Sequence, residues 1–233
     1  LDRSSAASDV YKRQLAPASV QEMADFVGLA FDLAFKYRNP AIILADGVIG
    51  QMMEKVVLPE QRPRLTNEEV MARCPWATFG KLKHRGPNIV TSLELDPAEM
   101  EKRNIHLQQK YAEIEEKEVR YEEIHCDDAE YLIVAFGSCA RIAQKAMEEA
   151  RAEGIKVGLL RPITLWPFPS KAIAERSRQV KGILTVELNA GQMVEDVRLA
   201  VECKVPVEYF GRLGGIVPDP DEVVTALKEK IIK

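Results

Sequence analysis

The segment YLIVAFGSCARIAQKAMEEARAEGIKVGLL, residues 131–160, decides the fold of this chain. Its first six residues are apolar and predict a buried strand, and Gly137-Ser138 then opens a helical pattern that Gly154 closes. A second apolar run follows over residues 156–160. A strand, a helix and a strand of these lengths are typical of a right-handed crossover between two parallel strands.

The same alternation continues to the C-terminus. We expect strands over residues 183–188 and 205–210, and helices over residues 170–180, 192–201 and 221–230. Strands that alternate with helices in this way predict an α/β fold, in which a mostly parallel sheet carries helices on both faces. This prediction applies to residues 127–233, which we expect to form a complete domain.

The N-terminal part predicts only a piece of a second domain. Ser19 and Glu22 have the spacing of a capping box, and apolar residues at helical spacing follow until Asn39-Pro40. The apolar run at residues 41–45 then fits a buried parallel strand. One helix and one strand are too little for a sheet, so we interpret residues 15–58 as the C-terminal remnant of a domain.

The remaining segments connect or precede these domains. Residues 1–14 are small, polar and without periodicity, and we interpret them as a non-native or disordered leader. Residues 59–126 form a linker: prolines interrupt residues 59–96, and residues 97–123 predict one long surface helix with acid–base pairs four residues apart.

Composition excludes several classes of function. With 32 Lys and Arg against 36 Asp and Glu, the net charge is −4, which argues against a nucleic-acid or anionic-membrane surface. No apolar run is long enough to span a bilayer, and no secretory signal begins the sequence. The four cysteines form no CxxC motif, which argues against zinc or an iron–sulfur cluster on this chain and favours reduced thiols in the cytoplasm.

Ligands of parallel sheets bind at the loops beyond the carboxyl ends of the strands. The first such loop begins at Asp46 and ends at Gln51, and it contains two glycines, Gly47 and Gly50. The second is Gly137-Ser138-Cys139, where Ser138 can cap the helix; it lacks the spacing of a nucleotide-binding loop, so plain capping is the favoured interpretation.

The other two loops carry more polar groups. Glu187, Asn189 and Gln192 form a polar cluster at the third loop, although the spacing favours a role for Asn189 as a helix cap. Arg212 lies among three glycines at the fourth loop, where it can clamp an anion or pair with an acidic loop of another chain. We take these two loops and the Asp46 loop as a candidate active-site rim or interface. The residues alone show no nucleophile–base pair, metal spacing or phosphate loop.

Four stretches together resemble one family. They are LAPASVQEM (residues 15–23), ILADGVIGQMME (43–54), RPITLWPFP (161–169) and ELNAGQMVEDVR (187–198). They resemble the 2-oxoacid:ferredoxin oxidoreductases, in the subunit that carries a thiamine-pyrimidine-binding domain and a domain like the C-terminal domain of transketolase. The resemblance is nearest to members that act on branched-chain 2-oxoacids such as 2-oxoisovalerate (3-methyl-2-oxobutanoate).

The resemblance implies a function for the complex rather than for this chain alone. Such a complex uses thiamine diphosphate and Mg²⁺ to decarboxylate and oxidise a 2-oxoacid to an acyl-CoA, and iron–sulfur clusters on other subunits pass electrons to ferredoxin. The implied partners are a thiamine-diphosphate-binding subunit, a gamma subunit and a ferredoxin-like subunit.

The family's activating glutamate belongs to a part of the pyrimidine-binding domain that has no counterpart here. We therefore assign no catalytic residue, expect no cofactor or metal on this chain alone, and expect the isolated chain to be inactive. Two alternatives stay open: a non-catalytic assembly module of such a complex, and a subunit of another transketolase-like thiamine enzyme.

Overall fold

The chain divides into two compact units: one comprises Leu1–Val57 and Tyr111–Lys233, and the other comprises Leu58–Lys110. A computed structural model describes residues 12–77, 80, 86, 89, 91 and 93–232. None of the helices in these ranges is both long enough and apolar enough to cross a bilayer.

The C-terminal part of the first unit is built on a five-stranded sheet with the order β3-β5-β4-β7-β8. Its strands are β3 (Tyr121–Ile124), β4 (Tyr131–Ala135), β5 (Val157–Pro162), β7 (Ile183–Glu187) and β8 (Val207–Gly211). The last four strands run parallel, and β3 is antiparallel to β5. This arrangement confirms the predicted α/β class with a mostly parallel sheet.

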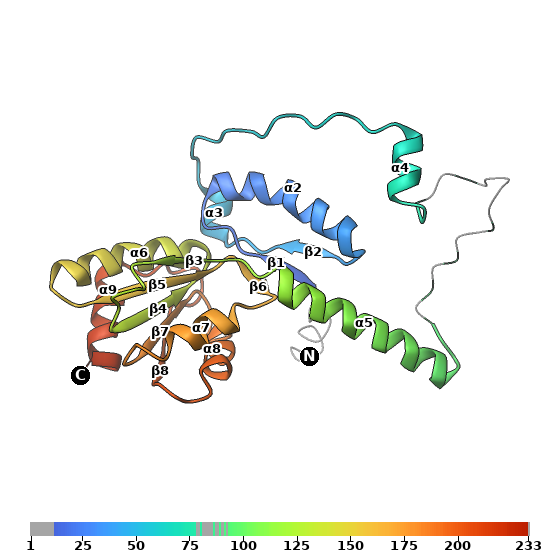
Figure 1. Cartoon of the computed structure of the whole chain (residues 1–233). Helices are drawn as coiled ribbons and strands as arrows, with labels where there is room; N and C mark the ends of the chain where they lie inside the picture. The colour runs from blue at the N-terminus through green and yellow to red at the C-terminus, as the bar shows by residue number, and fades with distance from the viewer. Residues whose placement is uncertain are drawn as a thin grey trace. The chain divides into compact units, whose positions relative to one another are not determined.

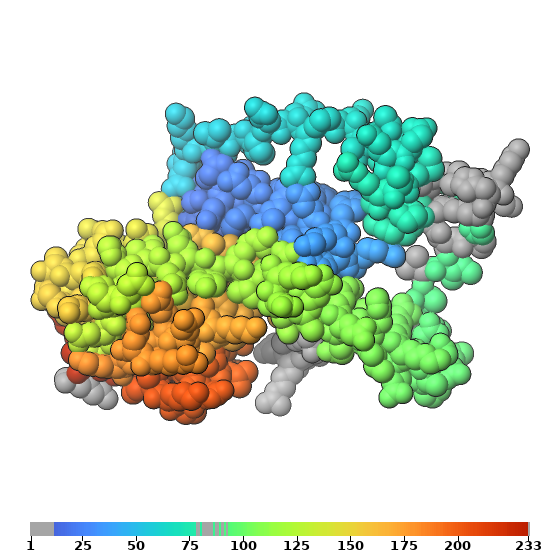
Figure 2. Space-filling view, viewed as in Figure 1, coloured from blue at the N-terminus to red at the C-terminus, as the bar shows by residue number. Residues whose placement is uncertain are grey.

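Helices cover both faces of this sheet (Figure 1). They are α6 (Gly137–Ala152) and α9 (Pro220–Leu227) on one face, and α7 (Ser170–Arg176) and α8 (Met193–Val201) on the other. Neighbouring residues of β4 point to opposite faces, so Ile133 joins the core under α6 and Leu132 the core under α8. In Figure 2 this part, yellow to red, is closely packed. A short π-helix, η1 (Lys228–Ile232), follows α9.

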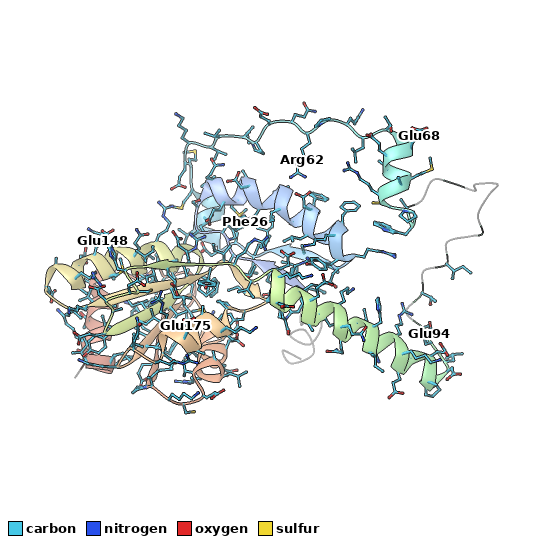
Figure 3. The ribbon with its side chains drawn as sticks, in the orientation of Figure 1. Phe26, Arg62, Glu68, Glu94, Glu148 and Glu175 are labelled. Carbon is cyan, nitrogen blue, oxygen red and sulfur yellow. The ribbon has the colours of Figure 1, made fainter. Side chains whose placement is uncertain are left out.

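The N-terminal part of the same unit carries a smaller sheet, with the order β2-β1-β6. It consists of β1 (Arg13–Leu15), β2 (Ala41–Ile43), which is parallel to β1, and β6 (Thr164–Trp166), which is antiparallel to it. Helix α2 (Val20–Tyr37) packs on this sheet through Phe26, labelled in Figure 3, and Ala30. A short helix, α3 (Gly47–Gln51), follows β2.

The linker differs from its prediction in two ways. The long helix predicted over residues 97–123 ends earlier: α5 spans Pro97–Lys117, and residues 121–124 form strand β3. Pairing along the edge of a sheet outweighs helical ion pairs, which contribute only a few tenths of a kcal/mol each. In the second unit, the segment predicted to be irregular contains α4 (Asn67–Arg73), which Thr66 and Glu69 begin as a capping box.

Two further strands lie outside the prediction. Strand β6 follows β5 after one residue, in a stretch for which the sequence pattern predicts no strand. Strand β1 contains Arg13 and Gln14, which the sequence analysis assigns to the leader. The absence of an apolar pattern does not prevent a strand here, because backbone pairing with β2 and β6 requires none. Residues 1–11 of the predicted leader lie outside the described residues.

The long-range ion pairs of Glu118 and Arg161 join the two parts of the first unit. The buried Glu118, just after α5, accepts hydrogen bonds from Lys36 Nζ at 2.7 Å, Tyr37 Oη at 2.8 Å and Arg120 Nη1 at 3.0 Å. Burial alone would raise the pKa of Glu118, but these three donors outweigh it and lower the pKa to about 2.

The second contact begins at the start of α2. Ser19 Oγ accepts from Glu22 N at 3.1 Å, as predicted for a helix cap, but the Glu22 carboxylate accepts from Ala18 N and not from Ser19 N. The same carboxylate binds Arg161 Nη2 of β5 at 2.5 and 2.7 Å. Glu22 therefore anchors α2 to the larger sheet.

Candidate functional site

A small cavity of about 170 Å³ lies where β2, β4 and β7 end. Four of the residues that line it are predicted site residues: Asp46, Glu187, Asn189 and Gln192. The full lining is Leu44, Ala45, Asp46, Phe136, Gly137, Cys139, Glu187, Leu188, Asn189 and Gln192. The structure therefore brings four of the six predicted site residues together, although Asp46 lies 141 positions before Glu187 in the sequence.

Glu187 is the most buried carboxylate of the cavity, with 1% of its surface exposed. Its Oε2 accepts from Gln192 N at 3.1 Å and Met193 N at 2.7 Å, and its Oε1 accepts from Val194 N at 3.0 Å. These are the free N–H groups at the start of α8, where the helix dipole favours a negative charge. Glu187 therefore acts as an internal cap of α8.

Asn189 and Gln192 complete the turn between β7 and α8. Asn189 Oδ1 accepts from Gly191 N at 2.7 Å and Gln192 N at 3.2 Å, both of which precede the first residue of α8. Asn189 therefore orders the turn before the helix, and the N-cap position of α8 is Gln192 instead. The Tyr209 hydroxyl donates to the carbonyl of Asn189 and fixes the turn against β8. The side chain of Gln192 is exposed at the rim.

Asp46 connects two helices from distant parts of the sequence. Its Oδ1 accepts from Val48 N and Ile49 N, both at 3.0 Å, and so caps α3. Its Oδ2 accepts from Ser138 N at 2.8 Å, in the first turn of α6. Gly137 adopts a φ of +61°, and a Cβ there would lie 2.8 Å from Asp46 Oδ2, so the approach requires glycine.

This contact corrects the predicted role of Ser138. Helix α6 has no side-chain cap of its own, and within the described residues Ser138 Oγ has no hydrogen-bond partner. A side chain 92 positions away supplies the cap instead, which no local pattern could indicate.

Cys139 lies between the two carboxylates and is buried. Burial, together with the negative charges of Asp46 and Glu187, raises the pKa of its thiol to about 12. The thiol is therefore protonated at neutral pH and is a poor nucleophile. The sequence placed Cys139 in the second loop without a role and did not single out Phe136, whose position directly after β4 was the available signal.

Arg212 and Gln51 do not line the cavity. Arg212 Nη2 and Nε bind the carboxylate of Glu222 in the first turn of α9, so the arginine pairs within its own chain. Gln51 is the last residue of α3, and it is exposed.

The two carboxylates of the cavity are already engaged in hydrogen bonds within the fold. All four carboxylate oxygens of Asp46 and Glu187 accept backbone N–H groups, and across the described residues no three His, Cys, Asp or Glu side chains are grouped to hold a metal ion. These contacts hold the loops after β2, β4 and β7 in place around a small pocket that both apolar and polar side chains line.

Two family models match successive parts of the chain. "Pyruvate flavodoxin/ferredoxin oxidoreductase, thiamine diP-bdg" matches residues 3–124, and "Pyruvate:ferredoxin oxidoreductase core domain II" matches residues 129–223. The first match covers more than half of the chain and includes the segment that we had set apart as a leader.

Curated relatives agree with these matches. The ketoisovalerate oxidoreductase subunit VorB of Methanothermobacter thermautotrophicus is 48% identical over 215 residues, which cover 92% of this chain and 59% of that protein. The 2-oxoglutarate synthase subunit KorA of Methanothermobacter marburgensis is 30% identical over 91% of this chain and 62% of its own length. The chain thus spans about three-fifths of the length of these relatives.

A solved structure shares the fold. The 2-oxoglutarate:ferredoxin oxidoreductase of Magnetococcus marinus matches with a TM-score of 0.71 and 22% identity, over 94% of this chain and 42% of that one. These findings confirm the family resemblance of the four stretches. The chain belongs to the pyruvate flavodoxin/ferredoxin oxidoreductase family and contains sequence of both its thiamine-diphosphate-binding domain and its core domain II.

Proposed function

We propose that this chain is part of a 2-oxoacid:ferredoxin oxidoreductase whose complex converts a branched-chain 2-oxoacid, such as 3-methyl-2-oxobutanoate, and coenzyme A to an acyl-CoA and CO₂. Ferredoxin takes up the electrons. The observation that carries this proposal is the 48% identity to VorB over 92% of the chain, which exceeds the 30% identity to KorA over a similar span.

We further propose that the chemistry depends on partner subunits. Thiamine diphosphate supplies the carbanion chemistry when it is bound, but the described residues do not fit its diphosphate and metal, because the cavity carboxylates are already helix caps. A thiamine-diphosphate-binding subunit would hold that end of the cofactor, and gamma and ferredoxin-like subunits would carry the iron–sulfur clusters. Four free cysteines agree with a reducing cytoplasm.

In this proposal residues 15–58 are the remnant of the pyrimidine-binding domain, residues 59–126 the linker, and residues 127–233 the transketolase-C-like domain. The boundary at residue 127 lies between the two family matches, which end at residue 124 and begin at residue 129. Asp46, Glu187 and Asn189 would order the rim of the active site, while the exposed Gln51 and Gln192 and the partly exposed Arg212 would face partners or substrate.

A chimera tests the substrate. The part of Methanothermobacter thermautotrophicus VorB that aligns with this chain would be replaced by residues 15–233 and assembled with the natural partner subunits. We expect ferredoxin reduction to be faster with 3-methyl-2-oxobutanoate than with 2-oxoglutarate. A preference for 2-oxoglutarate would contradict the branched-chain assignment.

The isolated chain provides a second test. With thiamine diphosphate, Mg²⁺, coenzyme A, 3-methyl-2-oxobutanoate and an artificial electron acceptor, we expect no turnover. Measurable turnover would show that the cofactor site is complete on this chain, and would contradict its dependence on partners.

The capping roles of Asp46 and Glu187 favour a second candidate function, a non-catalytic assembly module. Gln192→Ala and Arg212→Ala in the chimera separate the two functions, because both side chains are exposed or partly exposed and neither caps a helix. Variants that assemble normally but lose activity support a role in the active site. Variants that fail to assemble support the assembly module.

A further inference from the structure

Strand β8 is the last strand of the five-stranded sheet, and among the described strands it has a neighbour on one side only (Figure 1). Its sequence, VEYFG, combines β-branched and aromatic residues with one charge, that of Glu208. A strand of this composition at a free edge is prone to pair with another chain. At the opposite end of the sheet, β3 has the sequence YEEI and carries two carboxylates of its own. The composition of β8 therefore gives its edge less protection than that of β3.

The contacts between β8 and β7 show which carbonyls of β8 point to the free edge. Ile183 N of β7 donates to Pro206 O at 2.9 Å, and a hydroxyl of β7 donates to Glu208 O at 3.2 Å, so these two carbonyls face β7. Successive carbonyls of a strand point to opposite sides of it. The carbonyls of Val207 and Tyr209 therefore point away from β7, to the free edge.

Two cations bind these outward carbonyls. Arg198 Nη2 donates to Val207 O at 3.1 Å, and Lys230 Nζ donates to Tyr209 O at 2.7 Å. Arg198 belongs to α8 and Lys230 to η1, which pack on opposite faces of the sheet, so the two side chains reach the edge from both sides. Within the described part of the chain neither cation forms an ion pair, so the strand carbonyls are the acceptors that hold them.

We propose that Arg198 and Lys230 close the edge of β8 against pairing with a strand of another chain, a second copy of this one included. An incoming strand requires the carbonyls of Val207 and Tyr209 as acceptors for its own N–H groups. Both carbonyls already accept from a charged donor, and such hydrogen bonds are stronger than those between neutral groups. The two donor nitrogens also occupy the positions that incoming backbone nitrogens would take. This inference concerns self-association and goes beyond the proposed enzymatic function.

Removal of both donors tests the closed edge. In the full chain, Arg198→Met combined with Lys230→Met keeps an unbranched apolar side chain at each position but removes the donor. We expect the constant for self-association of this double variant, measured by analytical ultracentrifugation, to rise at least about tenfold over that of the parent. The amides of Tyr209 and Gly211 point to the same free edge, and in the associated protein they should exchange hydrogen at least about tenfold more slowly.

A matched double variant controls for the loss of two positive charges. Lys204 and Lys228 lie close in sequence to the ends of β8 and η1, but their amino groups bind the carboxylates of Glu202 and Glu153 and not the strand. Lys204→Met combined with Lys228→Met removes the same charge and adds the same side chains. It should associate like the parent.

A further pair of substitutions restores the donors. Arg198→Lys combined with Lys230→Arg keeps a cationic donor at each position and should associate like the parent. Arg198 and Lys230 are both exposed, so all of these variants should unfold near the parental midpoint. If the Met double variant unfolds, Lys230→Met alone is measured, with an expected rise in self-association of about threefold.

Four results would overturn the proposal. The first two are Met variants that associate no more than the parent, and a Lys204→Met, Lys228→Met control that associates as strongly as they do. The third is equally strong association of the variant with restored donors. The fourth is association that leaves amide exchange at Tyr209 and Gly211 unchanged. Because no turnover is measured, each result is independent of the proposed enzymatic activity.

Discussion

The two sheets of the first unit satisfy their polar groups in different ways. At the five-stranded sheet, the start of α8 is held locally by Glu187, within seven residues, whereas the start of α6 is capped by Asp46 from 92 positions away. The three-stranded sheet and α2 rely on distant partners, since Tyr37 and Glu118 are 81 positions apart and Glu22 and Arg161 are 139 apart. All strands of the larger sheet lie within residues 121–211, whereas the smaller sheet pairs β1 (Arg13–Leu15) with β6 (Thr164–Trp166).

The largest effect is expected at the internal cap of the larger sheet. Glu187→Ala would leave the two buried backbone N–H groups of Met193 and Val194 in α8 without an acceptor and should lower the free energy of unfolding by about 4 kcal/mol. Urea denaturation followed by circular dichroism measures this loss. Glu187→Gln keeps the shape and one acceptor and should lose about half as much. An unfolding curve for Glu187→Ala that matches the parent would contradict the capping role.

Glu118 tests the long-range attachment of the smaller sheet. Glu118→Gln removes the buried charge that Lys36 and Arg120 contact and should cost about 2 kcal/mol at pH 7. Hydrogen exchange should accelerate in α2 more than in α6, because the attachment is weakened and the larger sheet is not. Equal acceleration in both helices would show that the two parts unfold together.

The same residue predicts a pH dependence. The pKa of Glu118 is about 2 in the fold and near 4.5 when unperturbed, so its contribution to stability is present above about pH 4.5 and is lost as the pH falls toward 2. The stability difference between the parent and Glu118→Gln should therefore shrink across this range. A difference that stays constant from pH 6 to pH 3 would contradict the depressed pKa.

Asp46 combines a local and a distant contact. Its Oδ1 caps α3, which follows it directly, and its Oδ2 caps α6, 92 positions away. Asp46→Asn keeps an acceptor for Val48 and Ile49 but places an amide against Ser138 N, and it should cost about 1 kcal/mol. Exchange in the first turn of α6 should accelerate more than exchange in α3. Glu54→Gln is the matched control, since Glu54 forms an exposed long-range pair with Arg141, and it should behave like the parent.

The smallest effect is expected at Arg212. Its pair with Glu222 is partly exposed, and Arg212→Ala should leave the unfolding midpoint within experimental error of the parent. Differential scanning fluorimetry in low and high salt measures this. A clear destabilisation that salt abolishes would show that the pair stabilises the start of α9.

The sequence by itself determined the alternation of strands and helices from residue 131 onward, and with it the α/β class. These patterns are local: a strand buried on both faces is continuously apolar, and a helix repeats every three to four residues. The start of α2 at Ser19 was predictable for the same reason, because the contact between Ser19 and Glu22 N spans three residues.

The tertiary structure alone decided which distant groups meet. Strand β3 replaced the end of a predicted helix because β5 offered an edge, and Asp46 capped α6 because the fold brings α3 into contact with α6. The cavity that joins Asp46, Cys139 and Glu187 has the same origin. Such contacts depend on topology and on long-range packing, which leave no periodic signal in the sequence, whereas secondary structure follows from backbone geometry that neighbouring residues share.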